Sequence, residues 1–391
     1  MNIKVKAIFL LFAILFSLAR ICAQSNESCS MKISISTCSP GKDLYSSFGH
    51  TALRLRNNET NADVVFNYGT FDFNDPDFYV KFVKGKLSYY LSVQDYYGFL
   101  AAYRQENRSV IEQELQLSCQ QKQAIEQALS INFQPANRYY KYDFLKDNCT
   151  TRIRDLIFKN NAKFTTRNII PANTSARNLI DDALAKAGQW WSRLGIDILL
   201  GSKADKPLSN EQAMFLPEFL LHGIDSTANK DGSAIVLKKI NPVTTKQAER
   251  IYRWNMPLVV LTLICFILFL LYKLKYKNRN LAMNCIDFML FCLSGFAGVL
   301  ILFMWFGTDH TICRNNYNLL WAVPLNLIAA FFVFKPYRFR WYFIALSVLY
   351  GLLLIGWYLL PQQLNLALLP AVLLFLYRSI KLSYMSVKKN I

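Results

Sequence analysis

One cysteine stands in a setting that suits nucleophilic chemistry. Cys149 follows the polar pair Asp147 and Asn148, which is a good N-cap for a helix. The residues after it place apolar side chains at helical spacing, at Ile153, Leu156 and Ile157. Cys149 is therefore expected in the first turn of a helix, where unpaired backbone N–H groups and the helix dipole favour a thiolate. The sequence predicts a thiol nucleophile that needs a base.

Of the three histidines, His50 has the most suitable setting for that base. It follows Gly49, a residue that allows close backbone approach. Residues 51–56 alternate in polarity, and residues 64–68 do so approximately. The segment between them, residues 57–61, is rich in turn formers, so the pattern predicts a β-hairpin with His50 at the start of its first strand.

The hydrophobic pattern of this hairpin predicts its register. Pairing Leu53 with Phe66 gathers the apolar side chains on one face. Asn67 then becomes a diagonal neighbour of His50 on the opposite face. Its side-chain amide could orient the imidazole, as the third member of a catalytic triad does. The alternatives for that role are Tyr68, Ser47 or an acidic residue.

Each of these residues also has an ordinary structural interpretation. A free cysteine is more often a small buried hydrophobic residue, a single histidine at a strand start is usually structural, and Asn67 could simply end a strand. The candidates for substrate binding are Tyr68, Arg152 and His310. Because the three histidines are scattered without ligand spacing, we expect no metal site. We also expect no cofactor.

The chain has the sequence features of an exported membrane protein. Residues 1–23 combine a basic start, a short apolar core and a small residue at the end, which predicts a secretory signal peptide. An uncleaved anchor is the alternative. Residues 24–255 are mixed in polarity and form the expected catalytic domain, whereas residues 256–391 form the expected membrane domain. Its apolar stretches of spanning length are 257–272, 283–306, 317–334, 341–360 and 364–376.

Basic residues in the connecting loops predict the orientation of these five stretches. Lysine and arginine cluster after the first, third and last stretch, whereas the two other loops carry only Arg314. This positive-inside pattern places the C-terminus in the cytoplasm and residues 24–255 outside it. The formal net charge of +18 comes partly from these loops, so it is weak evidence for a nucleic-acid partner. His310 falls in a loop predicted on the same side as the exported domain.

Four of the nine cysteines fall in the exported domain, namely Cys29, Cys38, Cys119 and Cys149. An oxidising compartment allows a disulfide among the first three. If Cys149 is the nucleophile, at least one of those three stays unpaired. The sequence leaves the pairing open.

Several motifs resemble those of one family. Segments 37–41, 48–54, 67–73 and 147–152 are similar to the Lnb N-terminal periplasmic domain, and the likeness continues through 308–310 and 318–321. The resemblance implies an α+β domain like a circularly permuted NlpC/P60 (papain-like) fold, followed by an all-α transmembrane domain of about five helices. The order of His50 before Cys149 fits that permutation. It also implies that Cys149 is the nucleophile and His50 the base.

The activity implied by the resemblance is that of a lipoprotein N-acyltransferase in the bacterial inner membrane. The acyl donor would be a phospholipid, and the acceptor the α-amino group of the diacylglyceryl-cysteine of an apolipoprotein. Cys149 would carry the acyl chain as a thioester between the two. Two alternatives stay open. One is a membrane-bound thiol hydrolase of phospholipid or peptidoglycan, in which water replaces the amine, and the other is a non-enzymatic membrane scaffold.

Overall fold

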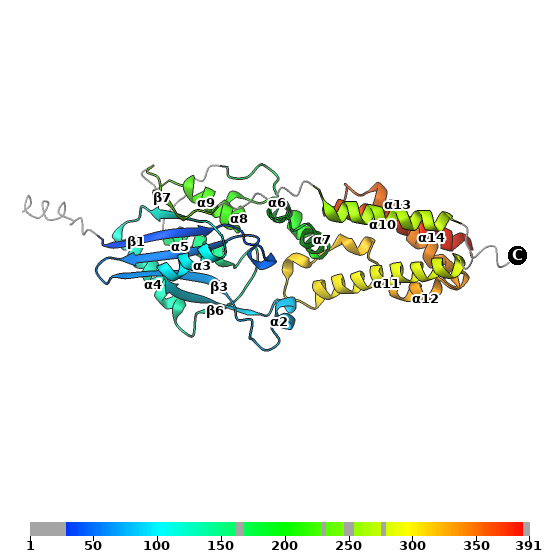
Figure 1. Ribbon diagram of the computed structural model, residues 1–391, viewed down its shortest axis with the longest axis horizontal. Helices are drawn as coiled ribbons and strands as arrows, with labels where there is room; N and C mark the ends of the chain where they lie inside the picture. Colours follow the sequence, from blue (N-terminus) through cyan, green and yellow to red (C-terminus); the bar gives the residue numbers. More distant parts are fainter. Residues whose placement is uncertain (1–28, 161–167, 229–231, 246–253, 275–278, 386–391) are drawn as a thin grey trace, which may run out of the picture.

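The computed structural model describes residues 29–160, 168–228, 232–245, 254–274 and 279–385. It has two parts, a domain of strands and helices and, after it, a domain of long apolar helices (Figure 1). The predicted α+β domain followed by a helical domain is therefore confirmed. The predicted signal peptide, residues 1–23, lies outside the described residues.

A seven-stranded antiparallel sheet with the order β6-β4-β3-β2-β1-β5-β7 forms the centre of the first domain. The predicted hairpin is its middle, since β2 and β3 pair with Leu53 opposite Phe66, and the predicted register is confirmed. The strands are Met31–Cys38 (β1), His50–Asn57 (β2), Ala62–Thr70 (β3), Ser88–Asp95 (β4), Val110–Leu115 (β5), Tyr139–Lys141 (β6) and Val236–Val243 (β7).

Helices cover both faces of this sheet. On one face lie α4 (Cys119–Phe133), α5 (Cys149–Asn160) and α9 (Pro217–Asp225), and Ile153 of α5 belongs to the same buried cluster as Leu53. On the other face α3 (Tyr96–Gln105) packs against Ala52 and Val65. The remaining elements of this domain are η1 (Leu44–Ser46), α2 (Phe78–Lys84), α6 (Ala176–Lys186), α7 (Trp190–Leu199), η2 (Ser202–Asp205) and α8 (Asn210–Ala213).

Among the described residues, four helices of the second domain are long and apolar enough to cross a membrane. They are α10 (Met256–Lys273), α11 (Arg279–Phe306), α13 (Arg340–Ile355) and α14 (Leu369–Met385). Their outward faces carry exposed apolar side chains, among them Phe266, Leu293 and Leu352. Such faces suit lipid tails, because the backbone polar groups of a helix are satisfied internally.

The third predicted stretch, residues 317–334, is not one continuous helix. It contains the 3-10 turn η4 (Tyr317–Leu320) and the short helix α12 (Asn326–Phe332), with Pro324 between them. Proline lacks an N–H and restricts the residue before it, so it interrupts a helix. Ser294 of α11 donates to the carbonyl of Trp321 at 3.0 Å and so satisfies part of the interrupted backbone. The other 3-10 turns are η3 (Thr311–Cys313), η5 (Pro336–Phe339) and η6 (Leu366–Leu368).

A buried charged cluster joins the two domains. Arg177 of α6 is 1% exposed and donates to Asp197 Oδ1 at 2.8 Å and to Asp205 Oδ1 at 2.9 Å. Asp197 Oδ2 also accepts a hydrogen bond from Asn365 at 2.7 Å, and the backbone oxygen of Asp197 accepts one from Asn318 at 3.1 Å. Because Asn318 and Asn365 belong to the helical domain, these bonds hold α6 and α7 against it.

We predict that Arg177→Ala lowers the stability of the whole protein by about 3–5 kcal/mol, because it leaves buried carboxylates without their cation. The measurement is the thermal unfolding midpoint of the purified full-length chain, followed by tryptophan fluorescence. The control is Lys186→Ala on the same helix, which removes an exposed ion pair with Asp182 and should cost less than about 1 kcal/mol. Equal midpoints for the two variants would contradict this role of Arg177.

Candidate active site

Cys149 is the first residue of α5, as the sequence predicts. Asn148 caps this helix, since its Oδ1 accepts hydrogen bonds from the backbone N–H groups of Thr150 and Thr151, both at 2.8 Å. The Asn148 amide nitrogen donates to the backbone oxygen of Phe215 at 2.9 Å and so ties the helix tip to the segment before α9. No described residue accepts a hydrogen bond from the backbone N–H of Cys149. The helix tip therefore presents a thiol beside an available N–H donor.

His50 begins β2, directly after a glycine that the backbone requires. Gly49 has a φ of +81°, and a side chain there would meet the backbone oxygen of Cys38 at 2.7 Å. The predicted neighbour relation with Asn67 is present, since His50 Nε2 lies 3.3 Å from Asn67 Oδ1. The Asn67 amide nitrogen faces the backbone oxygen of Val65 at 3.5 Å, so the amide oxygen is the atom turned toward the imidazole.

The structure brings Cys149 and His50 close enough for each group to shift the pKa of the other. Burial raises the pKa of the Cys149 thiol, but His50, the Thr51 backbone N–H and the Thr150 hydroxyl outweigh burial and lower that pKa from 9.0 to about 7. Burial lowers the pKa of His50, whereas the contacts with Cys149 and Asn67 raise it, with a net rise. The two groups thus favour a thiolate–imidazolium pair.

Gly69 of β3 leaves room for the thiol. Its φ is +87°, and a side chain at this position would lie 3.4 Å from the Cβ of Cys149 and 3.8 Å from the hydroxyl of Tyr140. The glycine therefore separates the nucleophile from a tyrosine by a space that no side chain of β3 occupies. A carbonyl group of a substrate could approach Cys149 through this space.

Tyr140 is a residue that the sequence did not single out. Its hydroxyl is buried, and among the described residues it has no hydrogen-bond partner. Burial and the neighbouring Cys149 raise its pKa, so it stays a protonated donor. The Arg152 guanidinium lies 3.5 Å above its ring and fixes its position. The only signal in the sequence is a tyrosine-rich run, residues 139–142, shortly before Cys149.

The three predicted substrate-binding residues lie in different settings. Tyr68 is buried, and its hydroxyl accepts a hydrogen bond from Asn132 at 2.7 Å. Arg152 donates to both carboxylate oxygens of Asp147, at 2.5 and 2.9 Å. His310 follows the end of α11, with its Nε2 3.2 Å from the backbone oxygen of Phe82 in α2. Their roles in substrate binding stay predictions.

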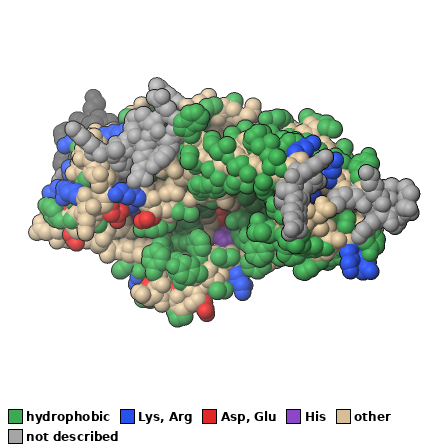
Figure 2. Space-filling view, turned by 45° about the vertical axis from the view of Figure 1, so that its right-hand side comes forward, with side chains coloured by type: hydrophobic (Ala, Val, Ile, Leu, Met, Phe, Trp, Pro, Cys, Tyr) green, Lys and Arg blue, Asp and Glu red, His purple; other side chains and the backbone are tan. Residues whose placement is uncertain are grey.

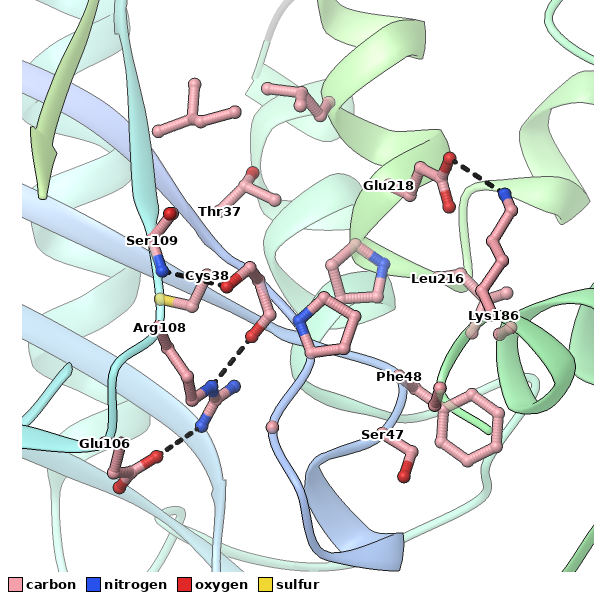
Figure 3. A pocket seen from close by; sticks show the side chains of 18 of the residues that line it. Thr37, Cys38, Ser47, Phe48, Glu106, Arg108, Ser109, Lys186, Leu216 and Glu218 are labelled. Atoms are coloured by element: carbon pink, nitrogen blue, oxygen red, sulfur yellow. Dashed lines mark hydrogen bonds and ion pairs between the residues drawn. The ribbon is translucent and has the colours of Figure 1, made fainter. Parts of the chain in front are cut away.

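A cavity of about 700 Å³ lies beside the strand ends that carry the site (Figure 3). Its wall includes Cys38, which pairs with His50 across β1 and β2. Apolar walls come from Phe48 and Leu216. The cations Arg108 and Lys186 pair with two carboxylates of the same lining, Glu106 and Glu218. Arg108 donates from Nε to the backbone oxygen of Ser39 and from Nη1 to Glu106. Its Nη2 is buried without a partner among the described residues. The cavity therefore combines apolar walls with paired charges, and Cys149, His50 and Asn67 are not among the residues that line it.

We predict that Cys149 is alkylated by iodoacetamide with a pH midpoint near 7. Because the pKa in the folded protein is lowered, the reaction is slow below this midpoint and reaches its plateau above it. Mass spectrometry of the labelled peptide measures the rate. His50→Ala should move the midpoint upward, and the buried Cys38, whose pKa is raised to about 12, should stay unlabelled. A wild-type midpoint near 9 would contradict the assignment.

Comparisons with known protein families match both domains of the chain. The model of the Lnb N-terminal periplasmic domain matches residues 19–181, and the model of the Lnb transmembrane domain matches residues 249–390. No curated protein and no solved structure matches the chain, so the likeness to a permuted NlpC/P60 fold stays an expectation. The two family models together span most of the chain, in the order of its two domains. This chain is therefore an Lnb-type inner-membrane protein, with a periplasmic domain followed by a transmembrane domain.

Proposed function

We propose that this protein is a lipoprotein N-acyltransferase. It moves an acyl chain from a phospholipid, through a thioester on Cys149, to the α-amino group of the diacylglyceryl-cysteine of an apolipoprotein. The observation that carries the proposal is the meeting of the Cys149 thiol, the His50 imidazole and the Asn67 amide at one end of the sheet. The family resemblance supports the reaction class, and the transmembrane helices suit substrates that are both embedded in lipid.

The first half of the reaction acylates Cys149. In neutral His50, an Nε2–H that donates to Asn67 leaves Nδ1 as the base that takes the thiol proton. The thiolate attacks the ester carbonyl carbon of the phospholipid. A carbon–sulfur bond forms and the carbon–oxygen bond to glycerol breaks, while His50 returns the proton to the leaving oxygen. The products are a thioester and a lysophospholipid.

The second half transfers the acyl chain to the lipoprotein. The α-amine attacks the thioester carbonyl and His50 takes up the proton that the nitrogen loses. A carbon–nitrogen bond forms, the carbon–sulfur bond breaks, and Cys149 leaves as a thiolate. The covalent intermediate divides one difficult exchange into two easier steps. It also lets the two lipid substrates use the same site in succession.

Two donors are available for the oxyanion that forms in each step. One is the backbone N–H of Cys149, which no described residue occupies. The other is the Tyr140 hydroxyl, which is buried and has no partner among the described residues. A buried donor without a partner costs stability, and it is a functional candidate when it faces a nucleophile. The Tyr140 hydroxyl and the Cβ of Cys149 both border the position that a side chain at Gly69 would occupy.

The proposal predicts that Cys149→Ser abolishes transfer. Full-length protein in nanodiscs is given a phospholipid with labelled acyl chains and a diacylglyceryl-cysteine peptide, and mass spectrometry detects the amide-linked product. Wild type and the control Cys29→Ser, at the opposite end of β1, should both form it. Transfer by well-folded Cys149→Ser would refute the proposal. Release of free fatty acid alone by wild type would favour a hydrolase.

If Tyr140 is an oxyanion donor, Tyr140→Phe should lower activity without lowering stability. The rate of thioester formation should fall about 100-fold, because one oxyanion donor is lost. The thermal unfolding midpoint should not fall, because the change removes a buried hydroxyl that has no partner among the described residues. The neighbouring Tyr139→Phe, at an exposed position on the same strand, should change neither. A lower midpoint with full activity would contradict this role.

A further inference from the structure

Large apolar side chains are exposed around α2, outside the membrane-spanning helices. We call this patch the α2 surface; it consists of Tyr45, Phe73, Tyr79, Val80, Phe82 and Val83. The patch is continuous, since the rings of Tyr45 and Phe73 lie 6.3 Å apart and that of Phe73 lies 5.0 Å from the buried Phe78 of α2. Contiguous exposed apolar patches of this kind mark surfaces that meet a partner.

Contacts with the loop after α11 fix the position of the α2 surface relative to the end of that helix. The backbone N–H of Asp309 donates to the carbonyl of Lys84 at 2.9 Å, and His310 Nε2 lies 3.2 Å from the carbonyl of Phe82. Asp309 and His310 follow the last residue of α11, Phe306, by only a few positions. Figure 1 shows α2 beside this end of α11. The α2 surface thus lies where α11 leaves the bilayer.

A chain of aromatic rings connects the α2 surface with the nucleophile. Phe78 lies 5.8 Å from Phe71, Phe71 lies 5.5 Å from Tyr89, and Tyr89 lies 4.4 Å from Tyr142, measured between ring centroids. A side chain at Gly69 would lie 3.7 Å from Tyr142 and 3.4 Å from the Cβ of Cys149, so both residues border this glycine position. Figure 2 shows hydrophobic side chains on both sides of a hollow between the first domain and the helical domain. These rings therefore form one packed apolar cluster that extends from the α2 surface to the neighbourhood of Cys149.

The outer leaflet of the bilayer is the occupant that these observations favour. Aromatic side chains prefer the interface between headgroups and acyl chains, which is the depth at which α11 ends. Lysines and aspartates both occur beside the patch, at Lys84, Lys86, Asp72 and Asp77. Because neither sign prevails, apolar contact rather than charge would hold the surface, and a neutral phospholipid suffices. A specific protein partner would be recognised through polar groups as well, and the α2 surface consists of apolar and aromatic side chains.

We propose that the α2 surface lies in the outer leaflet and is the entrance through which a phospholipid acyl chain reaches Cys149. The contact of the α2 surface with lipid does not depend on the proposed function. Its role as an entrance for the acyl chain rests on that function. The experiment replaces Tyr79 with p-benzoyl-L-phenylalanine in the full-length protein, reconstituted in nanodiscs of one neutral phosphatidylcholine. Tyr97 is the matched control, since it is as exposed as Tyr79, at 77%, and belongs to α3, outside the α2 surface. Irradiation and mass spectrometry then detect lipid adducts.

Lipid adducts at position 79 and none at position 97 are expected. Equal labelling of the two positions, whether high or low, would overturn the contact with lipid.

The entrance is tested by the rate of thioester formation in Tyr79→Asp and Tyr97→Asp. With bilayer phospholipid only Tyr79→Asp should lose activity, by about tenfold, and with a monomeric short-chain phospholipid neither should. Equal loss with both donors would overturn the entrance. If position 79 forms lipid adducts but the wild-type protein forms no thioester, the lipid contact stands and the proposed function is refuted.

Discussion

The docking of the α5 tip against the start of β2 is the contact on which the site depends. The hydroxyls of Thr51 and Thr150 lie 3.1 Å apart, and both residues are fully buried. Each hydroxyl would be costly to bury alone, so their mutual hydrogen bond favours one position of the helix tip on the strand. In that position the residue before Thr51 and the residue before Thr150 meet. These are His50 and Cys149.

The chemistry of the pair follows from where this contact puts it. Burial alone would raise the thiol pKa and remove the nucleophile at neutral pH. The imidazole, a backbone N–H and a hydroxyl reverse that effect because each of them favours the charged form of the sulfur. The Asn67 amide holds the imidazole in turn. The site is thus a set of polar groups whose pKa values depend on each other, and loss of one member changes the rest.

A second constraint is the attachment of this domain to the membrane helices. The Arg177 cluster ties α6 and α7 to η4 and η6, and the Asp309 backbone ties α2 to the end of α11. Asn318 and Asn365 of the membrane domain donate to Asp197, which Arg177 pairs, so a shift between the domains would leave buried polar groups without partners. The ester groups of phospholipids lie at the membrane interface. The distance between the first domain and the membrane surface therefore determines whether Cys149 can reach them.

Local features of this protein were predictable, and distant contacts were not. The cap at Asn148 and the hairpin register could be predicted because each depends on residues close together in the chain. Asn67 could be placed beside His50 for the same reason. The broken third membrane stretch was missed, because hydropathy counts apolar residues and does not weigh the effect of Pro324. Tyr140 was missed because an unpartnered hydroxyl is visible only when its surroundings are known.

The sequence by itself therefore determined the chemical types at the site, the strand and helix that carry them, and the division into an exported and a membrane part. These depend on periodicity, capping and hydropathy, which act over a few neighbouring residues. Only the tertiary structure decided that His50 and Cys149 meet and that Tyr140 faces them. It also decided that α2 lies at the membrane end of α11. Thr51 and Thr150 are 99 positions apart, and such contacts result from the packing of the whole domain, which no local pattern encodes.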